Sequence, residues 1–234
     1  MALINPNRGA SALALVAGYV DTLGFVALFG LFTAHVTGNF VLIGSELAKP
    51  GHGVLLKLLV FPAFILAVAL SRLISLHYER RARSPVRLLL MLEAVLLLAF
   101  MAAGMQAAPI ASPGTPMAII AGLAGAMAMG IQNGLGRLAL AKLTPTTVMT
   151  GNVTQLVIDL VDMAIGSTKT ETRARIIKQL GPITGFGLGA LAGALGYEHL
   201  GFMALLAPIT LVAALALEPS TLTPPEPIQG SATL

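Results

Sequence analysis

Long apolar blocks separated by short polar ones make up most of this chain. Six apolar runs approach the roughly 20 residues that a helix needs to cross about 30 Å of hydrocarbon. Two shorter runs, of about 12 and 9 residues, would cover only about half of that thickness at 1.5 Å per residue. The pattern predicts an all-α polytopic membrane protein. The long runs are 11–32, 54–76, 86–107, 117–141, 180–198 and 201–217, and the short ones are 37–48 and 150–158.

The basic residues indicate how the two short runs lie. If both runs turn back inside the membrane and the N-terminus is cytoplasmic, twelve of the 14 Lys and Arg residues lie on the cytoplasmic side, and only Lys49 and Lys57 lie outside. If both runs span, the 14 divide seven and seven. Because cytoplasmic loops are normally enriched in Lys and Arg, we predict six transmembrane helices and two short re-entrant half-helices. A bundle of eight spanning helices, two of them short and tilted, is the alternative.

A polar motif occurs twice in the chain. Thr37-Gly38-Asn39 opens the first short run, and Thr150-Gly151-Asn152 opens the second. Upstream of the triplets, Asp21 in the first long run aligns with Asn133 in the fourth, where Gln132 precedes it. Each unit holds three full spans, an odd number, so the second unit must be inserted upside down relative to the first. The sequence therefore predicts an inverted repeat, a common plan of transporters and channels.

The repeats also set the predicted domain boundaries. Residues 1–218 form a single membrane domain, with repeat 1 at about 10–108 and repeat 2 at about 116–218. The proline-rich stretch 219–234 is predicted to be a disordered tail.

Composition agrees with a membrane protein and excludes several other classes. The chain is 56% hydrophobic and 10% charged, with a mean hydropathy of +0.87. Its net charge of +4 comes from basic residues at the ends of apolar runs, so we expect no nucleic-acid partner. There is no Cys, the four His form no metal-binding pattern, and no phosphate loop or Ser/His/Asp arrangement is present. We expect no cofactor, no bound metal and no enzymatic activity.

Two acidic residues lie inside long apolar runs. Asp21 is close to the middle of its run, where a charge costs roughly 2.5–3.5 kcal/mol on insertion scales and marks a functional site by default. A carboxylate that only packs against neighbouring helices is the alternative. Glu93 lies within the third run, either on a pathway or as a partner for Arg72 or Arg87. His35 lies before the first triplet and could exchange protons with Asp21, or only pack at the membrane interface.

The triplets suggest where a solute would bind. Asn39 and Asn152 each begin a short helix whose first N–H groups have no intrahelical partner and whose dipole is positive at that end, which attracts anionic or hydrogen-bond-accepting groups. Alternatively, the polar side chains act as structural N-caps. The candidate pathway residues are Asp21, His35, Thr37, Gly38, Asn39, Glu93, Gln132, Asn133, Thr150, Gly151 and Asn152.

The same motifs carry a resemblance to a known family. The run Gly18-Tyr19-Val20-Asp21-Thr22-Leu23-Gly24-Phe25, the two Thr-Gly-Asn triplets and Gln132-Asn133 resemble the YoaK family over about residues 10–218. The resemblance implies a bacterial multi-pass inner-membrane protein, and it implies no settled substrate or reaction.

Taken from the residues, the function we expect is a small-solute transporter with its pathway between the two repeats. Because Asp21 faces the neutral amide of Asn133 at equivalent points, we favour proton coupling over a passive channel. A non-transporting membrane scaffold or sensor is the alternative. Expected partners are the lipid bilayer and a small molecule or ion. The Gly-rich helices are expected to pack against other helices of the same chain, with a homodimer seam as the alternative. We expect the inner membrane as location, with both termini cytoplasmic.

Overall fold

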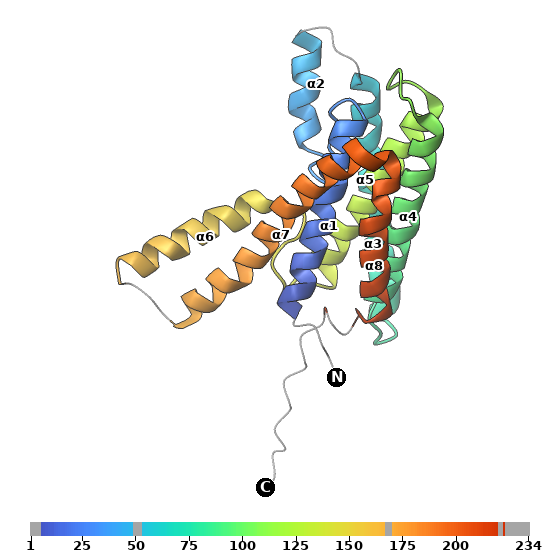
Figure 1. Ribbon diagram of the computed structural model, residues 1–234. Helices are drawn as coiled ribbons and strands as arrows, with labels where there is room; N and C mark the ends of the chain where they lie inside the picture. The colour runs from blue at the N-terminus through green and yellow to red at the C-terminus, as the bar shows by residue number, and fades with distance from the viewer. Residues whose placement is uncertain (1–5, 49–52, 167–169, 220–221, 223–234) are drawn as a thin grey trace.

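The computed structural model describes residues 6–48, 53–166, 170–219 and 222, and the regular structure in these residues is helical (Figure 1). This confirms the predicted all-α class. Of the predicted tail 219–234, all but Pro219 and Leu222 lie outside the described residues. The helices are α1 (Pro6–Ala27), α2 (Gly38–Ala48), α3 (Val54–Glu79), α4 (Val86–Ala107), α5 (Pro116–Leu138), α6 (Met149–Ala164), α7 (Thr170–Leu200), the 3₁₀-helix η1 (Gly201–Leu205) and α8 (Leu206–Leu217).

Among the residues that the structure describes, five segments are long and apolar enough to cross a membrane: α1, α3, α4, α5 and the continuous stretch 171–217. The last segment contains two of the six predicted spans. In Figure 1, α7 rises to the upper end of the bundle, η1 turns the chain, and α8 descends beside α4. The protein is therefore a multi-pass helical membrane protein.

The boundaries of three elements differ from the predicted ones. α1 ends at Ala27 rather than at 32, because Phe29 and Gly30 adopt positive φ angles of 54° and 74° and turn the chain. α6 continues to Ala164, and α7 begins at Thr170 instead of 180. The polar sequence at the start of α7 resembles a loop, but an ion pair between Asp159 and Arg175 holds it as a helix against α6.

The two helices that carry the aligned residues Asp21 and Asn133 are the most buried ones. Within the apolar windows, 67% of α1 and 72% of α5 are buried, against 33% of α3 and 39% of α4. α1 packs along α7, while α5 packs along α3 and α4. Figure 1 shows α1, α4 and α7 running upward and α3, α5 and α8 running downward, so that α1 begins and α8 ends at the same end of the bundle.

Glycine rows allow the closest helix contacts, which lie within the chain. A Cβ atom on Gly185, Gly189 or Gly193 of α7 would collide with the backbone of α1. A Cβ atom on Gly130 or Gly134 of α5 would lie within 2.8 Å of side-chain atoms of α3. Small residues spaced by four let helix backbones approach in this way. Each row joins a helix from one predicted repeat to a helix from the other.

Candidate functional site

Asp21 organises the loop between α1 and α2. Its side chain is buried, and Oδ1 accepts hydrogen bonds from the backbone N–H groups of Thr33 and Ala34, each at 2.7 Å. Its other oxygen, Oδ2, lies 2.7 Å from Nδ1 of His35. The structure thus brings Asp21 and His35 together, and it gives the carboxylate a structural role as well, because the loop is closed on it.

The environment of His35 favours its protonated form. The hydrogen bond that the His35 ring donates to Asp21 is the main cause of the raised pKa of His35; burial opposes the shift, and the charge of Asp21 adds to it. The side chain stays one-third exposed, at 33%, and its ring packs edge-on against Phe186 with 5.4 Å between centroids. A histidine that is partly exposed and paired with a buried carboxylate can take up and release protons near neutral pH.

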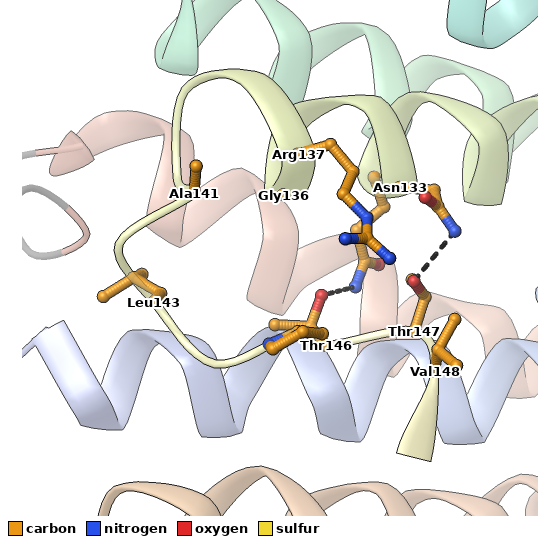
Figure 2. A pocket seen from close by; sticks show the side chains of 10 residues that line it. Asn133, Gly136, Arg137, Ala141, Leu143, Thr146, Thr147 and Val148 are labelled. Carbon is orange, nitrogen blue, oxygen red and sulfur yellow. Dashed lines mark hydrogen bonds between the residues drawn. The ribbon is translucent and has the colours of Figure 1, made fainter. Parts of the chain in front are cut away.

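The second repeat holds its loop in a related way. Asn133 of α5 donates from Nδ2 to Oγ1 of Thr147 at 3.0 Å (Figure 2). Gln132 donates from Nε2 to Oγ1 of Thr146 at 3.1 Å and to the carbonyl oxygen of Leu13 in α1 at 2.8 Å. Counted back from the triplets, Thr146 and Thr147 occupy the positions of Thr33 and Ala34. The two aligned residues, Asp21 and Asn133, therefore both fasten the loop that precedes a triplet.

The triplet asparagines close the same two loops. Asn39 donates from Nδ2 to the carbonyl oxygen of Phe32 at 2.8 Å, and Asn152 donates likewise to Pro145 at 2.8 Å. Both acceptors lie seven residues upstream. In the first repeat the N–H of Phe32 returns a bond to Oδ1 of Asn39 at 3.0 Å, which Pro145 cannot do because it has no N–H. The asparagines thus link helix to loop instead of capping their own helices.

The remaining triplet residues are placed differently in the two repeats. Thr37 is exposed and lines a cavity together with His35. Gly38 lies against the ring of Phe32, where a Cβ would come within 3.0 Å. Thr150 and Gly151 are exposed on α6, and a Cβ on Gly151 would meet nothing within 4 Å. The structure therefore groups the first triplet with the site more closely than the second.

Sequence reasoning missed a pair of ion pairs that anchor the short helices. Glu46 of α2 contacts Nζ of Lys57 in α3 at 2.7 Å, and Asp159 of α6 contacts Nη2 of Arg175 in α7 at 2.8 Å. Lys57 is 1% exposed and also donates to the carbonyl oxygen of Phe29 at 2.8 Å. The hydrogen bond from Arg175 lowers the pKa of Asp159. A signal was present, since each carboxylate follows its triplet asparagine by seven residues, two turns along one helix face.

Glu93 lies in α4 with no exposed surface. Neither carboxylate oxygen has a hydrogen-bond partner among the residues that the structure describes. The expected partnership with Arg72 is wrong, because Nη1 of Arg72 contacts Glu79 instead, at 3.1 Å. Within the described part of the chain, Glu93 forms no hydrogen bond with Arg87 either.

The helix register places Glu93 near the second loop. The Phe100 ring of α4 covers Gly125 of the antiparallel α5, at 3.0 Å from a Cβ placed there. Because α4 and α5 are antiparallel, seven residues back from Phe100 and seven residues forward from Gly125 move the same two helical turns along the bundle. These steps lead to Glu93 on α4 and to Gln132 on α5, which therefore lie at the same level. Oε1 of Gln132 also has no partner within the described residues. Leaving a buried polar group without a hydrogen bond costs about 1–3 kcal/mol, so such groups are rare in native proteins. Their presence here indicates a functional constraint.

Three cavities that share lining residues lie at the two loops. The first, of about 270 Å³, is lined by His35 and Thr37 of the first repeat, by Asn133 and Val148 of the second, and by apolar residues of α3. Asn133 and Val148 also line the second cavity, of about 180 Å³, shown in Figure 2. The third, of about 260 Å³, shares its Leu143 and Pro145 walls with the second and reaches Arg175 and Lys178.

The described side chains offer no metal centre. In the ranges 6–48, 53–166 and 170–219, no three His, Cys, Asp or Glu residues lie close enough to hold a metal ion.

The chain has several helices that can cross a membrane, and a polar loop follows each of its two most buried helices. These features define a polytopic membrane protein. Residues 9–217 match the family described as "Protein of unknown function (DUF1275)". The chain is 30% identical over 211 residues to the UPF0700 transmembrane protein YoaK of Bacillus subtilis (strain 168), covering 88% of this chain and 90% of that protein. The chain therefore belongs to this family, which confirms the resemblance noted in its motifs. No solved structure matches it.

Proposed function

We propose that this protein carries a small solute across the membrane along the cavities between its two polar loops. One observation supports this most strongly: His35 of the first repeat and Asn133 of the second line the same cavity. In transporters built from inverted repeats, the binding site lies at the repeat interface, where irregular backbone borders a cavity.

The arrangement of the helices supports an inverted repeat of six spans and two re-entrant half-helices. α1 and α5, which carry the aligned Asp21 and Asn133, run in opposite directions in Figure 1, as do α3 and α7. The hydrogen bond from each triplet asparagine to the carbonyl seven residues upstream recurs in both halves. The ion pair that joins each short helix to the next long helix also recurs. α2 and α6 are the two half-helices of this scheme.

Proton coupling is the form of transport that the site supports best. His35 lines the cavity, and the hydrogen bond between its ring and the buried Asp21 raises the pKa of His35, so the ring keeps a proton to a higher pH than a free histidine does. The aligned positions in the second repeat, Asn133 and Val148, do not titrate. A passive channel needs no such asymmetry, whereas a carrier uses a protonatable group on one side of its site. Glu93, buried at the level of Gln132, is a second candidate for the proton path.

The experiment is a solute screen on the protein reconstituted into liposomes, with transient currents recorded on a solid-supported membrane after rapid solute addition. The panel contains small acids, small amines and neutral solutes. Thr147→Val removes the hydroxyl that accepts a hydrogen bond from Asn133. Thr154→Val is the matched control, because it removes an exposed hydroxyl in the N-terminal half of α6.

We expect at least one solute to give a current with the wild type and with Thr154→Val, and a smaller current with Thr147→Val. A folded, reconstituted protein that gives no current with any solute would contradict the proposal and favour a scaffold or sensor. Equal currents from both variants would remove the second loop from the pathway.

A further inference from the structure

The first repeat shows what a loop of this kind binds. Its backbone N–H groups at Thr33 and Ala34 converge on one carboxylate oxygen of Asp21, each at 2.7 Å. Successive N–H groups that point into one concavity form an anion site. In the first repeat, the anion is therefore part of the chain.

The second repeat has the same loop without a carboxylate of its own. Asn133 occupies the position of Asp21 and directs a donor, Nδ2, toward the loop at Thr147. The backbone N–H groups of Thr146 and Thr147, the counterparts of the two that bind Asp21, are hydrogen-bonded to no residue in the described part of the chain. Both threonines are buried, with 6% and 4% of their surface exposed.

The threonine hydroxyls add further donors. Oγ1 of Thr146 accepts from Gln132, and Oγ1 of Thr147 accepts from Asn133. A hydroxyl that accepts one bond still has its own hydrogen to donate. Neither hydroxyl donates to an acceptor in residues 6–48, 53–166 or 170–219. Both hydroxyl oxygens thus accept a bond, while the two hydroxyl hydrogens and the two backbone N–H groups have no acceptor in the described part of the chain.

A cation completes the cavity. In Figure 2 the guanidinium group of Arg137 extends toward Thr146 and Thr147, and all three residues line the same cavity of about 180 Å³. Arg137 forms no ion pair with a described carboxylate, and no acidic residue lines the cavity. The aligned position in the first repeat is Phe25, which has no charge. Charge and donors are therefore concentrated in the repeat that has no built-in carboxylate.

We propose that this cavity binds the oxyanion of a small acid, a carboxylate or a phosphate. The guanidinium of Arg137 holds two oxygens in a bidentate pair, and the Thr146 and Thr147 donors hold the face that Asp21 presents in the first repeat. At about 30 Å³ per water-sized group, the volume admits about six such groups, which suits a small organic acid. The conclusion that a small acid is the transported substrate rests on the proposed function. The conclusion that the cavity binds an oxyanion does not.

The test measures anion binding to the full-length protein in nanodiscs of zwitterionic phosphatidylcholine. Sodium acetate, sodium lactate and inorganic phosphate are titrated against sodium chloride at equal ionic strength, by isothermal titration calorimetry and by thermal unfolding. Arg137→Gln removes the cation, and Asn133→Asp supplies a tethered carboxylate in place of the diffusible one. Arg87→Gln, which removes an exposed arginine at the start of α4, is the matched control.

We expect at least one of the three anions to bind and to stabilise the wild type and Arg87→Gln. Because charge-assisted bonds are lost, Arg137→Gln should bind at least about tenfold more weakly. Asn133→Asp should fold and should no longer respond to the anion. Binding that is equal in wild type and Arg137→Gln, or no binding at all, would overturn the site.

A second arm separates the two sources of such a group. If nanodiscs containing anionic phosphatidylglycerol abolish the response to soluble anions in the wild type, the oxyanion site stands, but its ligand is a lipid headgroup and the substrate assignment is overturned. If binding persists in both lipids, a soluble acid is supported. Anion binding without any solute current would contradict the proposed transport and leave the anion site intact. Currents with neutral solutes alone would leave the proposed transport intact and contradict an acid as its substrate.

Discussion

Replacing Asp21 with Asn changes one buried charge while leaving the shape of α1 almost unaltered. In the wild type, the carboxylate accepts two backbone N–H bonds of 2.7 Å and contacts His35 at 2.7 Å. A charge-assisted hydrogen bond contributes about 1.5–3 kcal/mol to stability and a neutral one about 0.5–1.5 kcal/mol. Converting the three charge-assisted bonds of Asp21 to neutral ones therefore removes about 3–4 kcal/mol in total. Relief from burying the charge offsets part of this loss, and we expect the folded state to be destabilised by about 2 kcal/mol.

The loss should depend on pH through His35. The hydrogen bond that His35 donates to Asp21 raises the pKa of His35, so the paired imidazolium stabilises the fold fully below the ordinary histidine pKa of 6.5. This contribution disappears as the pH rises through the higher pKa of the folded state. Asp21→Asn should therefore be most destabilised at about pH 6 and closer to the wild type at about pH 9.

The assay is thermal unfolding in detergent, followed by far-UV circular dichroism, because the chain has neither Trp nor Cys for fluorescence methods. A loss of about 2 kcal/mol corresponds to a drop in melting temperature of roughly 4–8 °C for a chain of this size. Asp162→Asn, which changes a half-buried carboxylate on α6 with no side-chain hydrogen bond to a described residue, is the control. A drop that is the same at both pH values would refute the role of His35, and no drop would refute the closure of the loop by Asp21.

Three further changes test other parts of the structure. Lys57→Met should lower the free energy of unfolding by about 3 kcal/mol, measured as above, because a partly buried carboxylate on α2 loses its ion-pair partner; an unchanged stability would contradict the anchoring of α2. Gly189→Leu should prevent close packing of α7 on α1 and give aggregated protein in size-exclusion chromatography, whereas Gly187→Leu, with open space around it, should stay monodisperse. Cysteines introduced as Ala82→Cys and Ala174→Cys should react with an impermeant reagent from the same side of the membrane, and labelling from opposite sides would refute the re-entrant arrangement of α6.

The sequence was sufficient to predict the helices that the membrane requires and the existence of a duplicated polar loop. The spans at 54–76 and 86–107 begin where α3 and α4 begin, since long apolar helices are determined by hydropathy alone. The alignment of Asp21 with Asn133 also corresponds to matching positions in the structure, because both side chains fasten the loop before a triplet.

Tertiary contacts explain what could not be predicted. Lys57 lies at the edge of an apolar run, and the charge count gives no sign that a glutamate on α2 and a carbonyl group pair with it inside the protein. Residues 170–179 are too polar to suggest a membrane helix, and they are helical because α6 packs on them through Asp159 and Arg175. The free donors of Thr146 and Thr147 become evident only beside their occupied counterparts in the first loop.

Accumulation of a solute in proteoliposomes under an imposed pH gradient tests the central claim most directly. The solute is one that gives a current with the wild-type protein, and uptake is compared with solute exchange in the absence of a gradient. If the carrier is coupled to protons through Asp21 and His35, the wild type should accumulate the solute and Asp21→Asn should lose accumulation while keeping part of the exchange. Normal pH-driven accumulation by Asp21→Asn would contradict the account and leave Asp21 with a structural role alone.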